Sequence, residues 1–192
     1  MKTGLIVAMK EEVPTNIGRD YFKEGEIYQI TPDLTLAITG FGKENAQFYT
    51  ERLCNMQELD ELVCLGFCGS VDNLTIGDVI SVEATKYKGA IIYLQNQNKF
   101  MNFRRGNMET FEEAGTSRNN ISEGILAVDM ESYFIAEIAE KYNLPLTIAK
   151  AVTDVIPFEP VKNPRERFLQ EFYRNLPVAK SSINKIFEEL RK

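Results

Sequence analysis

The chain has 192 residues, of which 44% are hydrophobic and 26% are charged, and it contains no histidine. This composition favours one globular domain over residues 1–192 and argues against a disordered or fibrous chain. The missing histidine excludes Ser-His-Asp and Cys-His nucleophile systems, histidine-containing zinc sites and imidazole acid–base chemistry. Any proton transfer therefore falls to carboxyl groups, lysine, tyrosine, cysteine or bound water.

The net charge of −6 argues against a nucleic-acid partner. No apolar stretch reaches the length of a membrane span, and the N-terminal apolar run is too short for a signal peptide. We therefore expect a cytoplasmic protein without a membrane partner. The three cysteines, Cys54, Cys64 and Cys68, have neither CxxC spacing nor a histidine partner, so we expect reduced structural thiols.

The first half of the chain alternates short apolar runs with turns and one helical pattern. Residues 3–9 are apolar and partly β-branched, as expected of a buried strand. In chain order, the further predicted elements are a hairpin at 27–30 and 34–39, a helix at 44–59, a strand at 62–65 ended by the glycine-rich residues 66–70, and strands at 78–82 and 90–94.

The second half begins with residues 95–124, whose mostly polar sequence predicts no regular element. Helical spacing then predicts a helix at 127–142, followed by a strand at 146–152 that leads into Thr153 and Asp154. Asn163 and Pro164 predict the start of a C-terminal helix that Pro177 should kink or divide. The alternation predicts an α/β fold of three layers, with a central mixed, mostly parallel sheet flanked by helices.

Acidic residues stand where apolar segments stop: Glu11 and Glu12 after the first strand, Asp129 and Glu131 at a predicted helix start, and Asp154 after the last strand. In open α/β sheets, ligands bind beyond the carboxyl ends of the strands. These carboxyl groups are therefore candidates for one cleft, although each alone is also compatible with a solvated loop or helix end.

Five segments together resemble the successive motifs of the purine nucleoside phosphorylase superfamily, and most closely its 5′-methylthioadenosine/S-adenosylhomocysteine nucleosidase branch. These segments are residues 6–13, 39–46, 66–69 followed by 76–79, 127–131 and 151–154. The resemblance implies a nucleoside phosphorylase-like fold, a purine nucleoside as the small-molecule partner, a homodimer, and neither cofactor nor metal.

The resemblance also implies a role for each matching residue. Glu12 matches the glutamate that orients and deprotonates the attacking water, and Glu131 the glutamate that holds the ribose hydroxyls. Met130 would pack on the sugar, and Asp154 matches the aspartate that protonates the purine at N7. Thr153 replaces a serine common in the family. An oxocarbenium-like transition state needs an acid on the leaving base and carboxylate charge near the sugar, so these residue types suit the chemistry.

Hydrolysis is favoured over phosphorolysis because Cys64 and Phe67 stand where phosphorylases of the superfamily carry an arginine and a small hydroxyl residue. Phe67 also departs from the serine usual in nucleosidases, and its ring could narrow, reshape or occupy the cleft. Phe41 could line the pocket near the 5′ substituent or belong to the core.

The sequence therefore predicts a purine nucleosidase that hydrolyses an adenine-type nucleoside, perhaps 5′-modified, to free base and sugar. A nucleoside- or base-binding homologue without turnover is the alternative, motivated by Phe67 and the short polar segment 95–124. In the family that segment supplies the aromatic that stacks on the base, with Met108, Phe111 or Phe103 as candidates here. The aromatic face of Phe168, Phe172 and Tyr173 is predicted to be core or subunit contact rather than a binding site.

Overall fold

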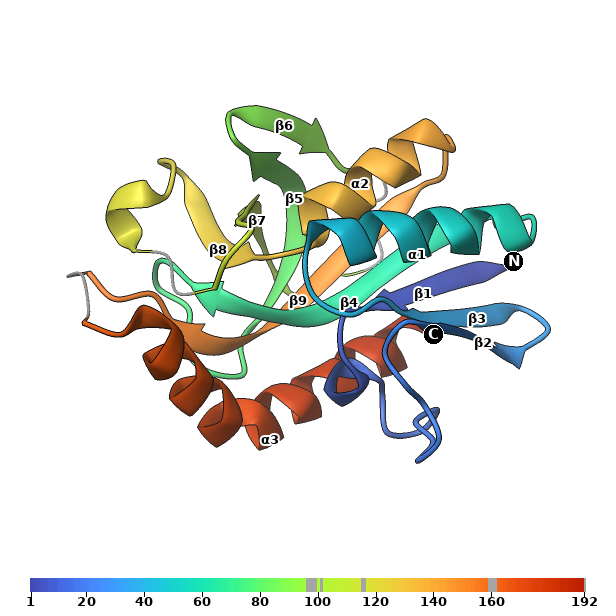
Figure 1. The fold of residues 1–192 in the computed structure, drawn as a ribbon, viewed down its shortest axis with the longest axis horizontal. Coiled ribbons are helices and arrows are strands. Elements are labelled where there is room, and N and C mark those ends of the chain that lie inside the picture. Colours follow the sequence, from blue (N-terminus) through green and yellow to red (C-terminus); the bar gives the residue numbers. More distant parts are fainter. Residues whose placement is uncertain (96–99, 101, 115–116, 159–161, 192) are drawn as a thin grey trace.

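The structure is a computed structural model that describes residues 1–95, 100, 102–114, 117–158 and 162–191 (Figure 1). Its strands are β1 Thr3–Val7, β2 Glu26–Thr31, β3 Leu34–Ile38, β4 Glu61–Ser70, β5 Val79–Tyr87, β6 Ala90–Tyr93, β7 Arg104–Thr110, β8 Ile125–Asp129 and β9 Leu146–Val155. Its helices are α1 Lys43–Met56, α2 Ser132–Lys141 and α3 Pro164–Leu190, with 3-10 turns η1 Lys10–Glu12 and η2 Arg118–Asn120.

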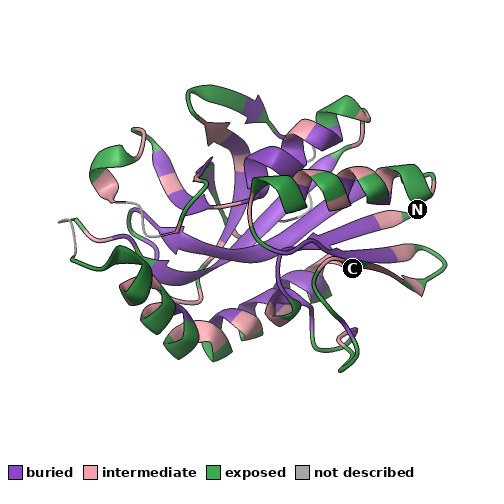
Figure 2. Ribbon diagram, viewed as in Figure 1, coloured by how far each residue is buried: buried purple, intermediate pink, exposed green. Residues whose placement is uncertain are grey.

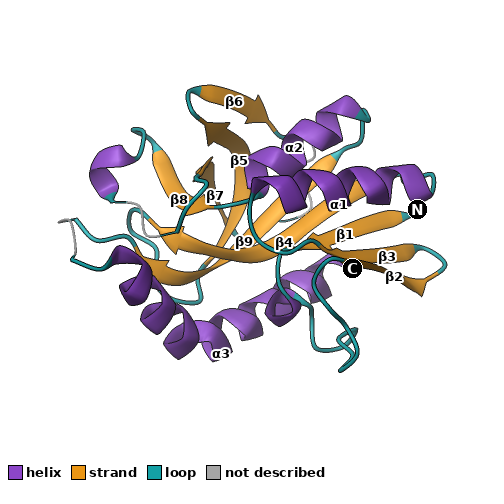
Figure 3. Ribbon diagram, in the orientation of Figure 1, coloured by secondary structure: helices purple, strands orange, loops and turns teal. Residues whose placement is uncertain are grey.

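The strands form one mixed sheet, part of which closes on itself (Figure 3). The hairpin of β2 and β3 continues through β1 to β4, and from there β8, β7, β5 and β9 return to β4. The predicted mixed α/β fold is therefore confirmed. The predicted central layer is corrected, because five of its strands form a closed barrel instead of an open sheet.

Helices cover this sheet system on two sides, with α1 and α2 on one and α3 on the other (Figure 1). The continuous apolar sequence of β1 follows from this arrangement, because alternate side chains of a strand point to opposite faces. Ile6 packs with the core under α1 and α2, whereas Leu5 and Val7 pack with the core under α3. Figure 2 shows buried residues along most of the sheet between the helices.

Several predicted elements are confirmed within a few residues: β1, the hairpin, α1, β5, β6 and β9. The start of α3 is also confirmed, with Asn163 as N-cap residue and Pro164 in the first turn. The Asn163 side chain makes no capping bond and instead donates to Glu166 at 3.1 Å. Pro177 does not divide α3, which is one helix that changes direction along its length (Figure 1).

Three predictions about elements are wrong. The glycine-rich residues 66–70 do not end a strand, because β4 continues through them with every residue buried. The predicted helix 127–142 is strand β8 followed by α2, since residues up to Asp129 pair with β4 and β7. Residues 95–124 contain β7 and η2, although 96–99, 101 and 115–116 of this segment lie outside the described residues. In the described part of the chain, no helix is both long and apolar enough to cross a membrane.

Candidate active site

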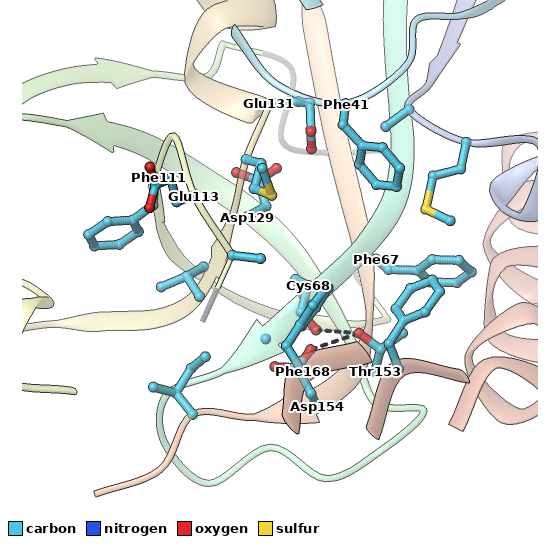
Figure 4. A pocket seen from close by; sticks show the side chains of 18 of the residues that line it. Phe41, Phe67, Cys68, Phe111, Glu113, Asp129, Glu131, Thr153, Asp154 and Phe168 are labelled. Atoms are coloured by element: carbon cyan, nitrogen blue, oxygen red, sulfur yellow. Dashed lines mark hydrogen bonds between the residues drawn. The ribbon is translucent and has the colours of Figure 1, made fainter. Parts of the chain in front are cut away.

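A pocket lies where the C-terminal ends of β4, β8 and β9 meet the segment after β1, with α3 beside it (Figure 4). It is lined by all seven residues that the sequence places in a candidate site: Glu12, Phe41, Phe67, Met130, Glu131, Thr153 and Asp154. Asp129 also lines it, whereas Glu11 does not. The structure therefore brings Glu12, Asp129, Glu131 and Asp154, four buried carboxyl groups, to one pocket.

Glu12 is held by backbone donors on two segments. One carboxyl oxygen accepts bonds from the amides of Ala8 and Met9 at 2.7 and 3.1 Å, and the other accepts a bond from the amide of Phe67 at 2.8 Å. Burial raises the pKa of Glu12, while the charge of Lys150 and these amides act in the opposite direction. The η1 turn after β1 thus fixes Glu12 against the middle of β4.

Glu131 is the N-cap residue of α2, but its carboxyl group points away from that helix end. It accepts a hydrogen bond at 2.9 Å from the amide of Gly42, at the start of α1. Burial, together with the nearby negative charge of Asp129, raises the pKa of Glu131 to about 8. Glu131 therefore links the two helices that flank this side of the pocket.

Asp129 forms a buried ion pair with Lys150, whose ammonium lies 3.1 Å from a carboxyl oxygen of Asp129. Asp129 also accepts bonds from the hydroxyl of Thr110 at 2.8 Å and from the amide of Ser132 at 3.0 Å. It therefore caps the start of α2 and neutralises a lysine of β9. Lys150 was missed from the sequence; the signal was a charged residue inside the apolar strand 146–152.

Asp154 is 5% exposed and accepts a hydrogen bond at 2.9 Å from the hydroxyl of its neighbour Thr153 (Figure 4). Burial is the main reason that the pKa of Asp154 is raised to about 6. A carboxyl group with this pKa is partly protonated near neutral pH, so it can donate a proton to a bound ligand.

Phe67 forms a wall of the pocket. Its ring packs edge-to-face against Phe172 of α3, with 5.7 Å between ring centroids, and Figure 4 shows it turned away from Glu131 and Asp129. Phe41 also lines the pocket, and 51% of it is exposed, so it does not belong to the core. Phe67 therefore bounds the pocket on the side of α3, and whether its ring narrows, reshapes or occupies the cleft stays open.

Phe168 and Phe172 pack in the core under α3, as predicted, but both also line the pocket, whereas Tyr173 is exposed. Sequence spacing alone could not show which face of α3 meets the strand ends. Of the three candidates for a stacking aromatic, only Phe111 lines the pocket; Met108 is fully buried in the core and Phe103 packs on Phe100.

The cysteines are unpaired, as predicted, but Cys68 lines the pocket. Burial raises the pKa of Cys64 to about 12 and also raises that of Cys68, so both thiols remain protonated near neutral pH. Among the described residues, no group of three or more cysteine or carboxylate side chains is arranged to hold a metal ion.

No protein-family model matches the chain. The chain is 28% identical to a 5′-methylthioadenosine/S-adenosylhomocysteine nucleosidase from Buchnera aphidicola subsp. Acyrthosiphon pisum (strain Tuc7), and this match covers 80% of the chain and 85% of that protein. This identity and this coverage are those of a distant homologue.

Solved structures share the fold over nearly the whole chain. The MTA/SAH nucleosidase of Streptococcus pneumoniae, in complex with 8-aminoadenine, has a TM-score of 0.80 at 20% identity, covering 100% of this chain and 99% of that one. The futalosine hydrolase of Helicobacter pylori strain 26695 has a TM-score of 0.79 at 15% identity, covering 100% and 97%. Because these identities are low, the two structures establish the fold and not the reaction.

Proposed function

We propose that this chain, a distant homologue of the 5′-methylthioadenosine/S-adenosylhomocysteine nucleosidases, hydrolyses the N-glycosidic bond of a purine nucleoside. The substrate is an adenine-type nucleoside, including ones modified at the 5′ position, and the products are free base and sugar. The relative from Buchnera aphidicola is a nucleosidase, and the relative from Streptococcus pneumoniae holds an adenine analogue.

The observation that carries the proposal is the meeting of Glu12, Glu131 and Asp154 in one pocket, each buried and each in a different environment. Asp154, with its pKa raised to about 6, suits a proton donor. Glu12, bound by three backbone amides and close to a lysine, is the group best placed to take a proton from water.

In the proposed reaction, Asp154 donates its proton to N7 of the purine while the bond between C1′ and N9 breaks. The positive charge that develops on the sugar is stabilised by the nearby carboxylates. Water adds to C1′, and Glu12 accepts the proton that this water loses. Glu131 holds the ribose hydroxyls and Met130 packs on the sugar, while Thr153 orients Asp154, and Phe41 and Phe67 line the pocket.

Water is proposed as the nucleophile because the chain lacks the expected phosphate ligands. Cys64, at the place of a phosphorylase arginine, is 1% exposed and belongs to the apolar core. Lys150, a cation next to Glu12, is already paired with Asp129. We further propose a cytoplasmic homodimer that acts in nucleoside catabolism and methionine salvage, without a cofactor.

The test is to incubate the purified chain with 5′-methylthioadenosine, S-adenosylhomocysteine, adenosine and inosine, with and without phosphate, and to separate the products by chromatography. The proposal predicts free base from at least one adenine nucleoside at a rate that does not depend on phosphate. Release that requires phosphate would indicate a phosphorylase. Thermal stabilisation by adenine without any base release would favour the binding homologue.

A further inference from the structure

The end of β9 carries a β-bulge at Thr153. Along β4 and β9 the paired residues pass from Cys68 with Val152 directly to Gly69 with Asp154, so that Thr153 is an extra residue. A bulge bends its strand and re-aims the following side chains. In a regular strand, the side chains of Thr153 and Asp154 would point to opposite faces. Here they meet, since the Thr153 hydroxyl lies 2.9 Å from the Asp154 carboxyl group.

The partner strand leaves room for this arrangement. A Cβ atom at Gly69 would lie 3.0 Å from a carboxyl oxygen of Asp154 and 2.8 Å from the Cδ1 atom of Ile156, so glycine leaves the carboxyl group room to pack closely against β4. The Thr153 hydroxyl also lies 3.3 Å from the carbonyl of Cys68 and can donate across the strands. Bulge and glycine together aim Asp154 into the pocket.

A residue far along the chain holds the bulge from outside the sheet. The side-chain amide of Asn175, half-buried on α3, donates a hydrogen bond at 2.8 Å to the carbonyl of Thr153. That carbonyl belongs to the peptide group immediately before Asp154. On its other side, the guanidinium of Arg167 donates to the carbonyl of Val155 at 3.2 Å. The carbonyl groups of Thr153 and Val155, the residues on either side of Asp154, are therefore each bound by a side chain of α3.

We infer that Asn175 is a positioning residue for Asp154, which by donating to the carbonyl of the bulged Thr153 keeps the carboxyl group of Asp154 aimed at the bound base. The inference rests on the proposed function, in which Asp154 is the proton donor. Asn175 itself does not line the pocket, so it acts through the backbone and not on the substrate.

The kinetic test combines Asn175→Ala and Asp154→Asn, singly and together. Because small misplacement of a catalytic group lowers the rate strongly, Asn175→Ala is expected to lower kcat about tenfold or more, with KM changed less than about threefold. In the Asp154→Asn background the same change should cost nothing further, because the group that it positions is gone. An equal loss in both backgrounds would overturn the inference.

Asn184 provides a matched control on the same helix. It is also half-buried, and its side chain accepts a bond from the amide of Thr15 at 2.9 Å, away from the pocket. Asn184→Ala should leave kcat within about twofold of the parent chain. If Asn175→Ala does not fold, Asn175→Leu keeps a similar side-chain volume without a donor, and the same outcomes are expected of it.

A second readout does not depend on activity. The Asp154 carboxyl carbon is titrated by NMR in the parent chain and in Asn175→Ala. The charged or titratable groups that face Asp154 are Cys68 of β4 and Arg167 and Glu171 of α3, and this variant alters none of them. A released carboxyl group gains solvent, so its pKa should fall from about 6 towards 3.8. An unchanged pKa of Asp154 in the variant would overturn the inference. A lowered pKa in a chain that releases no base would support the positioning role of Asn175 and reject the proposed function.

Discussion

The candidate site is built around carboxyl groups, and each of them has different hydrogen-bond or ion-pair partners. Asp154 has one hydroxyl donor, Glu12 has three backbone amides, and Asp129 has a lysine. Their positions could be predicted because each follows a strand or precedes a helix within a recognisable motif. Asn175 could not be predicted, because its contact joins segments distant in the sequence and it belongs to no motif. Lys150 left one signal, a charged residue within an apolar strand, but not its partner Asp129.

The raised pKa of Asp154 predicts how its replacement changes stability with pH. The folded chain binds the proton with a pKa of about 6 and the unfolded chain with 3.8, so the folded state holds more protons between these values and loses stability as pH rises through them. Above pH 6, the ionisation of buried Asp154 has lowered the free energy of unfolding by about 3 kcal/mol. Asp154→Asn removes this cost, so it should raise the free energy of unfolding at pH 8 relative to the parent chain, with little effect of ionisation at pH 3.

Urea unfolding of both chains at pH 3 and pH 8 measures this difference. A stabilisation by Asp154→Asn that is the same at both pH values would contradict the raised pKa. The comparison between the two pH values matters more than either value alone, because the amide also changes the hydrogen bond with Thr153.

Glu131 is proposed to bind the sugar and not the base. Glu131→Gln keeps an oxygen that can accept from the Gly42 amide, so the fold should be retained. We expect the affinity for a non-hydrolysable adenine nucleoside to fall about tenfold, a typical effect of weakening a buried hydrogen bond. Affinity for free adenine should change less than about twofold, because adenine lacks the ribose.

Isothermal titration calorimetry with the two ligands measures both affinities. Asn184→Ala is the control, since Asn184 bonds to Thr15 and does not line the pocket, so neither affinity should change. Equal loss of affinity for adenine and nucleoside in Glu131→Gln would place Glu131 elsewhere than at the sugar.

At the scale of elements, β4 is the strand on which the site depends. Its residues 66–70 look like a loop in the sequence because glycine and polar residues are common there, yet they pair with β9 and are buried. The glycines serve close packing within the strand, a purpose that local propensity does not distinguish from a turn. Strand β7 is not predicted for a different reason, because its exposed residues interrupt the apolar pattern.

This packing predicts that Gly66→Ala lowers activity. The added Cβ would lie 2.8 Å from both the Glu12 carboxyl oxygen and the Lys150 ammonium, so Glu12 must move and its bond from Phe67 must weaken. We expect kcat to fall about tenfold or more, because Glu12 loses its position for accepting a proton. Steady-state kinetics on the purified variant provide the measurement.

Gly18→Ala is the matched control, because a Cβ atom there meets neighbours only at 3.4 Å or more. It should retain parental activity. If Gly66→Ala were as active as Gly18→Ala, the position of Glu12 would not matter for the reaction.

At the scale of the whole molecule, the pocket is assembled from the beginning, middle and end of the chain. Glu12 follows the first strand, Glu131 begins α2, and Asp154 ends the last strand beside α3. The sequence predicted this mixed α/β arrangement from alternating elements and motif order. It did not predict the closed barrel, because closure depends on which strands pair, and pairing between distant segments leaves no local pattern.

The central claim is that this assembled pocket breaks N-glycosidic bonds with Glu12 as the group that accepts a proton from water. The most direct measurement is the rate of free base release from 5′-methylthioadenosine by the parent chain and by Glu12→Gln, followed by chromatography under identical conditions. We expect release by the parent chain and a rate at least about a hundredfold lower in the variant, within the range typical for loss of a general base. Equal rates in the two chains would show that Glu12 does not accept this proton.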